Sequence, residues 1–179
     1  MEKHSRIYAE IDLDAIEKNF ENMRANISPS SKMIAVIKAD GYGHGAVPIA
    51  HLMEEKEYLW GFAVATAEEA YELRSHQIHK PILILGYTFA EDYEAFARQQ
   101  IRPTVFQYEM AKAMSDAAVK SGETIKIHLA VDTGMTRIGF RDDASSLQMI
   151  RQIQKLPGLS IEGLFTHFAK ADERDKEYT

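Results

Sequence analysis

A lysine at the end of an apolar run is the residue of this sequence best suited to react with a small molecule. The run Met33–Lys38 ends in Lys38, and the loop 41–45 that follows has glycine at alternate positions, with Tyr42 and His44 between them. Burial at a strand end disfavours the charged amine and lowers its pKa, which prepares a lysine to form a Schiff base with an aldehyde. The glycines let the backbone approach a ligand closely. The alternative is a lysine that simply extends its ammonium group into solvent.

Two later apolar runs also end in polar side chains. Asp132 and Arg137 flank a turn in VDTGMTRIGF, and His167 follows the apolar run in GLFTHFAKAD. An arginine at this place could bind a carboxylate or a phenolate through two nitrogens, although an Asp132–Arg137 pair could also serve only to tie the loop. His167 could likewise be a hydrogen-bonded core residue. No role follows for five other histidines, which lack the spacing of a metal site: His4, His51, His76, His79 and His128.

The elements that would position these residues alternate between strand and helix. Six short apolar runs suit buried strands, and segments with helical spacing lie between them, which indicates βα units and a parallel sheet. Two helix starts have the spacing of a capping box, Asp14 with Glu17 and Thr66 with Glu69. A further strand is expected at Arg6–Leu13, in a different sheet from the others. The six main strands are expected at Met33–Lys38, Gly61–Thr66, Pro81–Gly86, Arg102–Phe106, Ile125–Asp132 and Ile161–Phe168.

The fold class expected from this alternation is α/β, with the first six or so βα units of a TIM (β/α)8 barrel. The glycine-rich fingerprint of dinucleotide binding and the Walker pattern are both absent from the sequence, which argues against an open nucleotide-binding sheet. A complete barrel takes about 250 residues, whereas this chain has 179. Because an arc of six strands would leave two unpaired edges, we expect the barrel to be incomplete and the chain to be a piece of a longer protein.

Composition and charge narrow the class of protein further. With 45% hydrophobic and 27% charged residues, the chain is expected to fold around a packed core. No apolar run approaches the ~20 residues of a membrane helix, so we expect a cytoplasmic protein with no membrane partner. A net charge of −6 argues against a general affinity for nucleic acid, which depends on basic residues. The absence of cysteine excludes disulfides, thiolate metal sites and a cysteine nucleophile.

Four segments occur in a characteristic order along the chain: AEIDLDAIEKN, AVIKADGYGHG, HLAVDTGMTRIGF and EGLFTHFAKADE. Together they resemble the alanine racemase family of pyridoxal-phosphate enzymes. The resemblance implies a (β/α)8 barrel followed by a separate β-domain, in a homodimer whose two sites each take residues from both subunits. Residues 1–13 would then contribute a strand to that absent β-domain, and residues 14–179 would form part of the pyridoxal-phosphate-binding barrel.

The resemblance also implies roles for individual residues. Lys38 would hold pyridoxal 5'-phosphate covalently and act as the acid or base on one face of the substrate Cα. Tyr42 would hydrogen-bond the cofactor phosphate, Arg137 would contact the phenolic oxygen of the cofactor and the substrate carboxylate, and His167 would lie against the pyridine ring. The second base of the family is a tyrosine of the partner subunit, outside these residues. One departure is Ala130, where many members carry a lysine that orients the arginine, so another anion or a water must hold Arg137 here.

The implied reaction is the racemisation of L- and D-alanine, which supplies D-alanine for peptidoglycan. The substrate would be a free amino acid, and this chain, the amino-terminal part of the enzyme, is expected to be inactive alone. Related racemases act on serine or on a broader range of amino acids. A second hypothesis is another barrel-type pyridoxal-phosphate enzyme, such as a decarboxylase or a D-amino acid aldolase. A third is a protein that binds pyridoxal phosphate without turnover, because the second base is absent from these residues.

Overall fold

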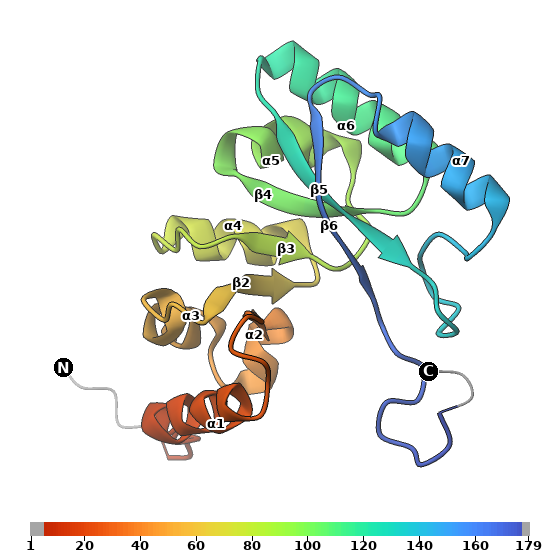
Figure 1. Ribbon diagram of the computed structural model, residues 1–179. Coiled ribbons are helices and arrows are strands. Elements are labelled where there is room, and N and C mark those ends of the chain that lie inside the picture. Colours follow the sequence, from red (N-terminus) through yellow and green to blue (C-terminus); the bar gives the residue numbers. More distant parts are fainter. Residues whose placement is uncertain (1–5, 177–179) are drawn as a thin grey trace.

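Six parallel strands form one sheet in the computed structural model, which describes residues 6–176 (Figure 1). The order of the strands in the sheet follows their order in the chain, so each strand pairs with the next. All six predicted strands are present, with ends shifted by at most two residues, which confirms the α/β class. The strands are β1 (Met33–Val36), β2 (Leu59–Val64), β3 (Ile82–Ile84), β4 (Ile101–Val105), β5 (Ile125–Val131) and β6 (Leu159–Thr166).

Helices connect the strands and cover one face of the sheet. Apolar side chains from both layers make one core, in which Phe62, Ile84, Met114 and Ile127 are fully buried. No helix within residues 6–176 is long and apolar enough to cross a membrane. The helices are α1 (Leu13–Ala25), α2 (Lys38–Gly43), α3 (Ala46–Glu54), α4 (Ala67–Ser75), the 3-10 turn η1 (Ala90–Asp92), α5 (Tyr93–Gln99), α6 (Tyr108–Ser121) and α7 (Ala144–Ile153).

The starts of two helices test the predicted capping boxes. The box at Thr66 and Glu69 is confirmed, because the Thr66 hydroxyl accepts from the Glu69 N–H and the Glu69 carboxylate accepts from the Thr66 N–H. The box predicted at Asp14 and Glu17 is wrong. Asp12 is the N-cap instead, since its backbone is extended and its carboxylate accepts from the N–H three residues later at 2.9 Å. Helix α1 therefore begins two residues earlier than predicted.

The strand predicted at Arg6–Leu13 does not form within the described residues. Residues 8–12 belong to no strand, and Leu13 is the first residue of α1. A strand forms where a neighbouring strand pairs its backbone groups, and the only sheet in the described part of the chain is the six-stranded one. The assignment of residues 1–13 to a separate β-domain stays a prediction, and residues 1–5 lie outside the described part.

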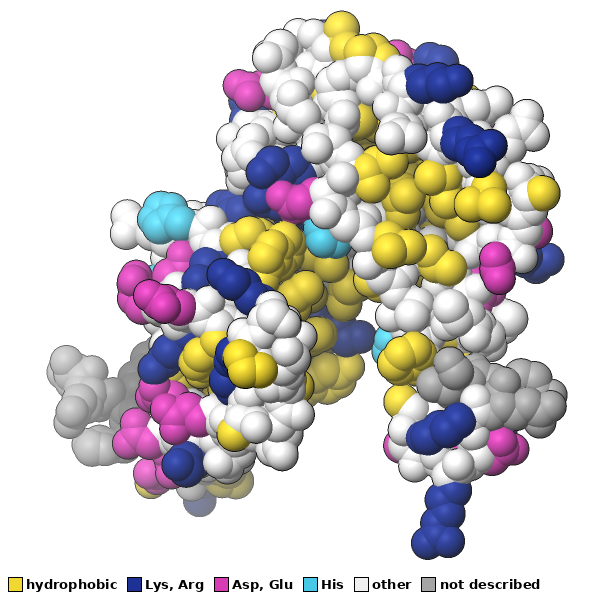
Figure 2. Space-filling view, in the orientation of Figure 1, with side chains coloured by type: hydrophobic (Ala, Val, Ile, Leu, Met, Phe, Trp, Pro, Cys, Tyr) yellow, Lys and Arg dark blue, Asp and Glu magenta, His cyan; other side chains and the backbone are white. Residues whose placement is uncertain are grey.

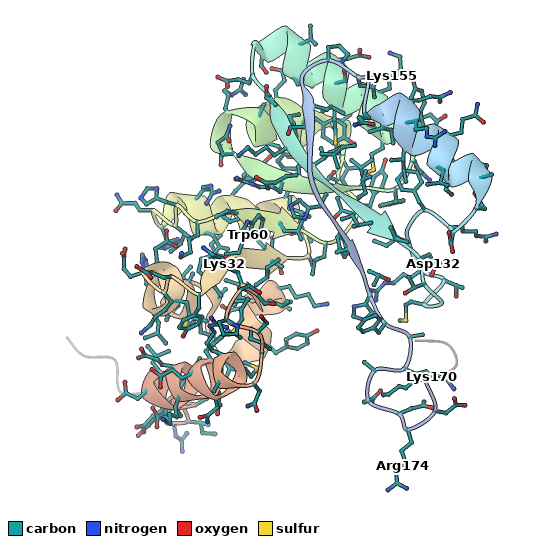
Figure 3. All side chains as sticks on the ribbon, in the orientation of Figure 1. Lys32, Trp60, Asp132, Lys155, Lys170 and Arg174 are labelled. Atoms are coloured by element: carbon teal, nitrogen blue, oxygen red, sulfur yellow. The ribbon has the colours of Figure 1, made fainter. Side chains whose placement is uncertain are left out.

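The inner face of the sheet, opposite the helices, carries a cluster of charged side chains. The carboxylate of Glu162 in β6 lies 3.1 Å from Arg102 Nε, 3.2 Å from Lys126 Nζ and 3.3 Å from His128 Nε2. The His128 ring also packs against Trp60, the second residue of β2, which is labelled in Figure 3, with 5.4 Å between ring centroids. Burial lowers the pKa of His128, while Glu162 opposes this effect. His128 is therefore a partnered interior histidine.

The sheet is open at both edges. Among the described residues β1 pairs only with β2, and β6 pairs only with β5. The side chains of Val36 in β1 and Leu164 in β6 are 55% and 66% exposed. Figure 2 shows hydrophobic side chains gathered over β6 and α7. The six strands thus form an open half-barrel, as the incomplete barrel predicted from the sequence requires.

Candidate active site

Lys38 lies just beyond β1, at the start of a turn with rare backbone angles. The predicted strand ran to Lys38, but β1 ends at Val36. The N–H of Ile37 still donates to the carbonyl oxygen of Ala63 at 2.9 Å, whereas its carbonyl oxygen accepts from the N–H of Gly41 at 3.0 Å, inside the turn. From residue 39 to residue 42 the backbone is left-handed, with φ between 51° and 58°. Three of these four residues carry a Cβ, for which this conformation costs about 1–2 kcal/mol each. Contacts from outside the turn must therefore stabilise it.

Two hydrogen bonds to residues outside the turn stabilise it, one made by a side chain of the turn and one by a side chain of α4. Asp40 Oδ1 accepts from the N–H of Ala46 at 2.7 Å, which ties the turn to the start of α3. On the other side, Glu69 Oε1 accepts from the N–H of Ala39 at 2.6 Å. Lys38 is half-buried and immediately precedes this second contact. The peptide that follows Lys38 is therefore held by a neighbouring βα unit.

Arg137 lies in the loop between β5 and α7, which folds back on its own strand. Asp132, labelled in Figure 3 just beyond β5, accepts through Oδ1 from the N–H groups of Thr136 at 2.9 Å and Gly134 at 3.0 Å. The bond from Thr136, followed by that from Gly134, lowers the pKa of Asp132. Asp132 holds the loop through these backbone bonds and forms no ion pair with Arg137 in the described part of the chain. The alternative that an Asp132–Arg137 pair ties the loop is therefore wrong.

One pocket brings three of the four predicted site residues together. Lys38, Arg137 and His167 line a pocket of about 140 Å³ at the carboxyl ends of the strands. An amine beside a guanidinium and an imidazole, against an apolar wall, suits covalent capture of an aldehyde whose molecule also carries negative charge. The remaining lining residues are apolar: Val36, Leu85, Ala130, Val131, Ile138 and Phe165.

Tyr42 is placed differently from the other three predicted residues. It lies on the left-handed turn but does not line the pocket, and it is 72% exposed. Its contact with a cofactor phosphate stays a prediction. Arg137 has no hydrogen-bond or ion-pair partner among residues 6–176. Ala130, at the position where many members of the family carry a lysine, lines the same pocket. No carboxylate of the described chain takes over the task of holding Arg137.

Of the residues that the sequence analysis missed as site residues, three at this end of the sheet matter most for the site. Leu85 follows β3 and Phe165 lies near the end of β6, and both are apolar walls of the pocket. Their positions were the signal that could have found them, because inward-facing residues at strand carboxyl ends border the same space in a barrel. The third is Glu69, whose sequence signal indicated only a helix cap.

Comparisons with known proteins cover nearly the whole chain. Residues 11–179 match the family described as "Alanine racemase, N-terminal domain". The chain belongs to this family. It is 48% identical over 180 residues to an alanine racemase of Clostridium tetani (strain Massachusetts / E88), an alignment that covers 100% of this chain and 46% of that protein.

Solved structures of racemases share the fold. An alanine racemase of Clostridium difficile 630, in complex with cycloserine, has a TM-score of 0.91 at 43% identity, over 94% of this chain and 46% of that one. A histidine racemase from Leuconostoc mesenteroides subsp. sake has a TM-score of 0.83 at 30% identity, over 93% of this chain and 44% of that one. The chain thus spans about half the length of these relatives and corresponds to the amino-terminal portion of an alanine racemase.

Proposed function

We propose that this chain is the amino-terminal part of the barrel of a pyridoxal-phosphate-dependent enzyme that interconverts L- and D-alanine and so supplies D-alanine for peptidoglycan. The observation that carries the proposal is the pocket in which Lys38, Arg137 and His167 meet. Because the chain spans about half the length of its relatives, the activity belongs to the complete protein that contains it. A homodimer acting in the cytoplasm, as expected from the sequence, is part of this proposal.

The residues around the pocket fit pyridoxal phosphate. Lys38 offers the primary amine that an aldehyde requires, and Leu85 and Phe165 offer apolar surface for a pyridine ring. Arg137, which is unpaired within the described residues, is available for the phenolic oxygen of the cofactor or for a substrate carboxylate. When bound, this cofactor withdraws electron density from the substrate Cα, so that the Cα proton becomes removable.

Each of these side chains has a task in the proposed reaction. Arg137 binds the substrate carboxylate and orients the Cα atom toward Lys38. The Lys38 amine takes the Cα proton, or returns it, on one face of the substrate. His167 would hold the cofactor ring, and Tyr42 would hold its phosphate. Racemisation also needs a proton donor on the opposite face, and we assign it to a tyrosine of the partner subunit, as the resemblance to the family implies.

A racemase for a different amino acid is the second candidate. It is favoured by the likeness to the histidine racemase, which shows that this half-barrel also occurs in an enzyme named for another amino acid. Alanine, serine and histidine offered separately to the complete protein, with chiral chromatography of the product, separate the candidates. Fastest turnover of alanine supports the proposal, and fastest turnover of serine or histidine supports the second candidate. Binding of pyridoxal phosphate without turnover of any of them indicates a cofactor-binding protein.

Substitution of Lys38 tests the proposed function directly. Lys38→Ala in the complete protein is expected to abolish both the visible absorbance band of lysine-bound pyridoxal phosphate and racemisation, because the covalent link and the base are the same amine. Lys32→Ala is the matched control, since Lys32 lies just before β1, at the opposite end of the strand from Lys38. We expect the control to retain both signals. A Lys38→Ala protein that keeps either signal would remove Lys38 from its assigned role.

A further inference from the structure

The carboxylate of Glu69 does more than cap α4. Its Oε2 accepts from the N–H of Thr66 at 3.3 Å, as a capping box requires, and from the N–H of Ala65 at 2.6 Å. Its Oε1 accepts from the N–H of Ala39 at 2.6 Å, across 30 positions of sequence. One carboxylate thus joins the backbone beyond β1 to the backbone beyond β2, at the end of the sheet where Lys38 enters the pocket.

Backbone N–H groups are the partners of this carboxylate. Glu69 is half-buried, and within residues 6–176 it forms no ion pair with a lysine, arginine or histidine. Hydrogen bonds to a charged acceptor are shorter and about twice as strong as bonds between neutral groups. The two 2.6 Å contacts, to Ala39 and Ala65, are short enough to be bonds of this kind.

The peptide that Glu69 holds is the first of the left-handed turn. Ala39 has φ 51° and ψ 47°, a conformation that residues with a Cβ rarely adopt, and the turn continues through Tyr42. The orientation of this peptide sets the direction in which the preceding residue, Lys38, can extend its side chain. Release of the Ala39 N–H would let the turn relax toward right-handed backbone and would redirect the Lys38 amine.

We propose that Glu69 is a positioning residue, whose carboxylate keeps the Lys38 amine in the pocket by holding the Ala39 N–H. This inference rests on the function proposed for Lys38. Glu69 itself lines no part of the pocket and acts only through the backbone of the turn.

Glu69→Gln in the complete protein tests this role, because the amide keeps the size of the side chain, removes its charge and offers one acceptor oxygen where the carboxylate uses two. Without cofactor, we expect hydrogen exchange at the Ala39 amide to accelerate by about tenfold or more, the factor that corresponds to loss of one hydrogen bond to a charged group. With pyridoxal phosphate as the probe, the dissociation constant is expected to rise by a similar factor. For alanine, kcat is expected to fall while KM changes little, since the substrate contacts of Arg137 are retained.

Two control variants separate this role from the capping of α4. Glu68→Gln removes the same charge from the same helical turn, but Glu68 is exposed and has no contact with Ala39. Thr66→Ala removes the cap hydroxyl and leaves the Glu69 contact to Ala39 in place. Both controls are expected to keep the slow exchange at Ala39 and the affinity for pyridoxal phosphate, although Thr66→Ala lowers the melting temperature.

A rescue variant tests the turn itself. Ala39→Gly added to Glu69→Gln is expected to recover most of the lost affinity, because glycine adopts left-handed backbone without external support. Should Glu69→Gln fail to fold, Glu69→Asp takes its place with the same expectations. Aspartate keeps the charge but is one methylene shorter and does not reach both strand ends.

Three results would overturn the inference. The first is that Glu69→Gln leaves both the hydrogen exchange at the Ala39 amide and the affinity for pyridoxal phosphate unchanged. The second is that Thr66→Ala loses as much of this affinity as Glu69→Gln. The third is that adding Ala39→Gly to Glu69→Gln recovers none of the lost affinity. Failure of the proposed function gives a different result. In that case pyridoxal phosphate does not attach to Lys38 in the unaltered protein, whereas exchange at the Ala39 amide still reports whether Glu69 holds this peptide.

Discussion

The polar residues of the pocket depend on backbone conformations that few residue types tolerate. Lys38 precedes four left-handed residues, and Arg137 follows Thr136, whose φ is 55°. Gly139, two residues after Arg137, has φ 129°, which L-residues with a side chain rarely adopt. A Cβ at this glycine would lie 2.5 Å from the backbone nitrogen of Asp132. The loop that carries Arg137 can therefore lie against β5 only because residue 139 has no side chain.

Gly139→Ala is accordingly expected to destabilise the complete protein by about 3 kcal/mol, because it combines backbone strain with a clash against main-chain atoms that cannot move away. We also expect KM for alanine to rise, since the loop must shift and take Arg137 with it. Gly122→Ala is the control: Gly122 has φ 70° but no atom within 4 Å of an added Cβ, so strain alone predicts a loss of about 1 kcal/mol. Urea unfolding measures both losses, and equal losses in the two variants would contradict the close approach at Gly139.

At the scale of the strands, the carboxylate of Glu162 links β4, β5 and β6 inside the half-barrel. The pairing of β5 with β6 moves from Ile127↔Ile161 to His128↔Gly163, which makes Glu162 an extra residue in β6. A bulge of this kind redirects a side chain. Here it accompanies a Glu162 carboxylate that contacts Arg102 of β4, and Lys126 and His128 of β5.

The charged cluster predicts a dependence of stability on pH. Burial alone would raise the pKa of Glu162, but Arg102, followed by Lys126 and His128, lowers it from 4.5 to about 2. A carboxyl group with a depressed folded-state pKa stabilises the protein above its unfolded pKa, and this stabilisation is lost as pH falls from about 4.5 to about 2. Glu162→Gln is therefore expected to lose on the order of 2 kcal/mol at neutral pH and to unfold with a weaker acid dependence.

The control for this prediction is Glu94→Gln. Glu94 pairs with Lys120 and Arg98 at the surface, where ion pairs contribute little. Melting temperatures of the complete protein, measured from neutral pH to about pH 3, compare the two variants. An acid dependence of Glu162→Gln as steep as that of the unaltered protein would contradict the role assigned to the cluster.

The half-barrel as a whole leaves apolar surface without a cover. Both edge strands have one neighbour in the described part of the chain, and Ile34 and Val36 of β1 expose 40% and 55% of their surface. In Figure 2 hydrophobic side chains also gather over β6 and α7 at the other edge. Relatives are about twice as long as this chain, so their remaining half has the length needed to complete the barrel.

Residues 1–179 made alone are therefore expected to bind a hydrophobic dye and to self-associate, because exposed strand edges and apolar patches promote both. The complete protein is expected to do neither at the same concentration. Dye fluorescence and light scattering measure the difference. A sharp cooperative melt of the monomeric 179-residue chain, without dye binding, would show that the half-barrel is stable on its own.

Local patterns predicted most of the elements because the residues that face the core recur in the sequence with the period of a helix or a strand. Each apolar run became a strand, and Thr66 with Glu69 became a capping box, since the partners are three residues apart. The start of α1 was misassigned because aspartates stand at both positions 12 and 14, and only the backbone angle and the hydrogen bond of Asp12 identify it as the N-cap. The strand at Arg6–Leu13 was predicted from alternation alone, but strand pairing depends on a neighbour that alternation does not supply.

Residue types and spacing were enough to identify the half-barrel and to predict that Lys38, Tyr42, Arg137 and His167 would stand at one end of it, because parallel strands bring their carboxyl ends to one edge. Three of these four residues line the pocket there, and Tyr42 does not. Contacts between distant segments could not be read in this way. The left-handed turn after Lys38, the unpaired Arg137 and the bond from Ala39 to Glu69 depend on distances and angles between segments. These distances are set only when the chain packs. The sequence shows which residues are polar, but it does not show which of them come into contact.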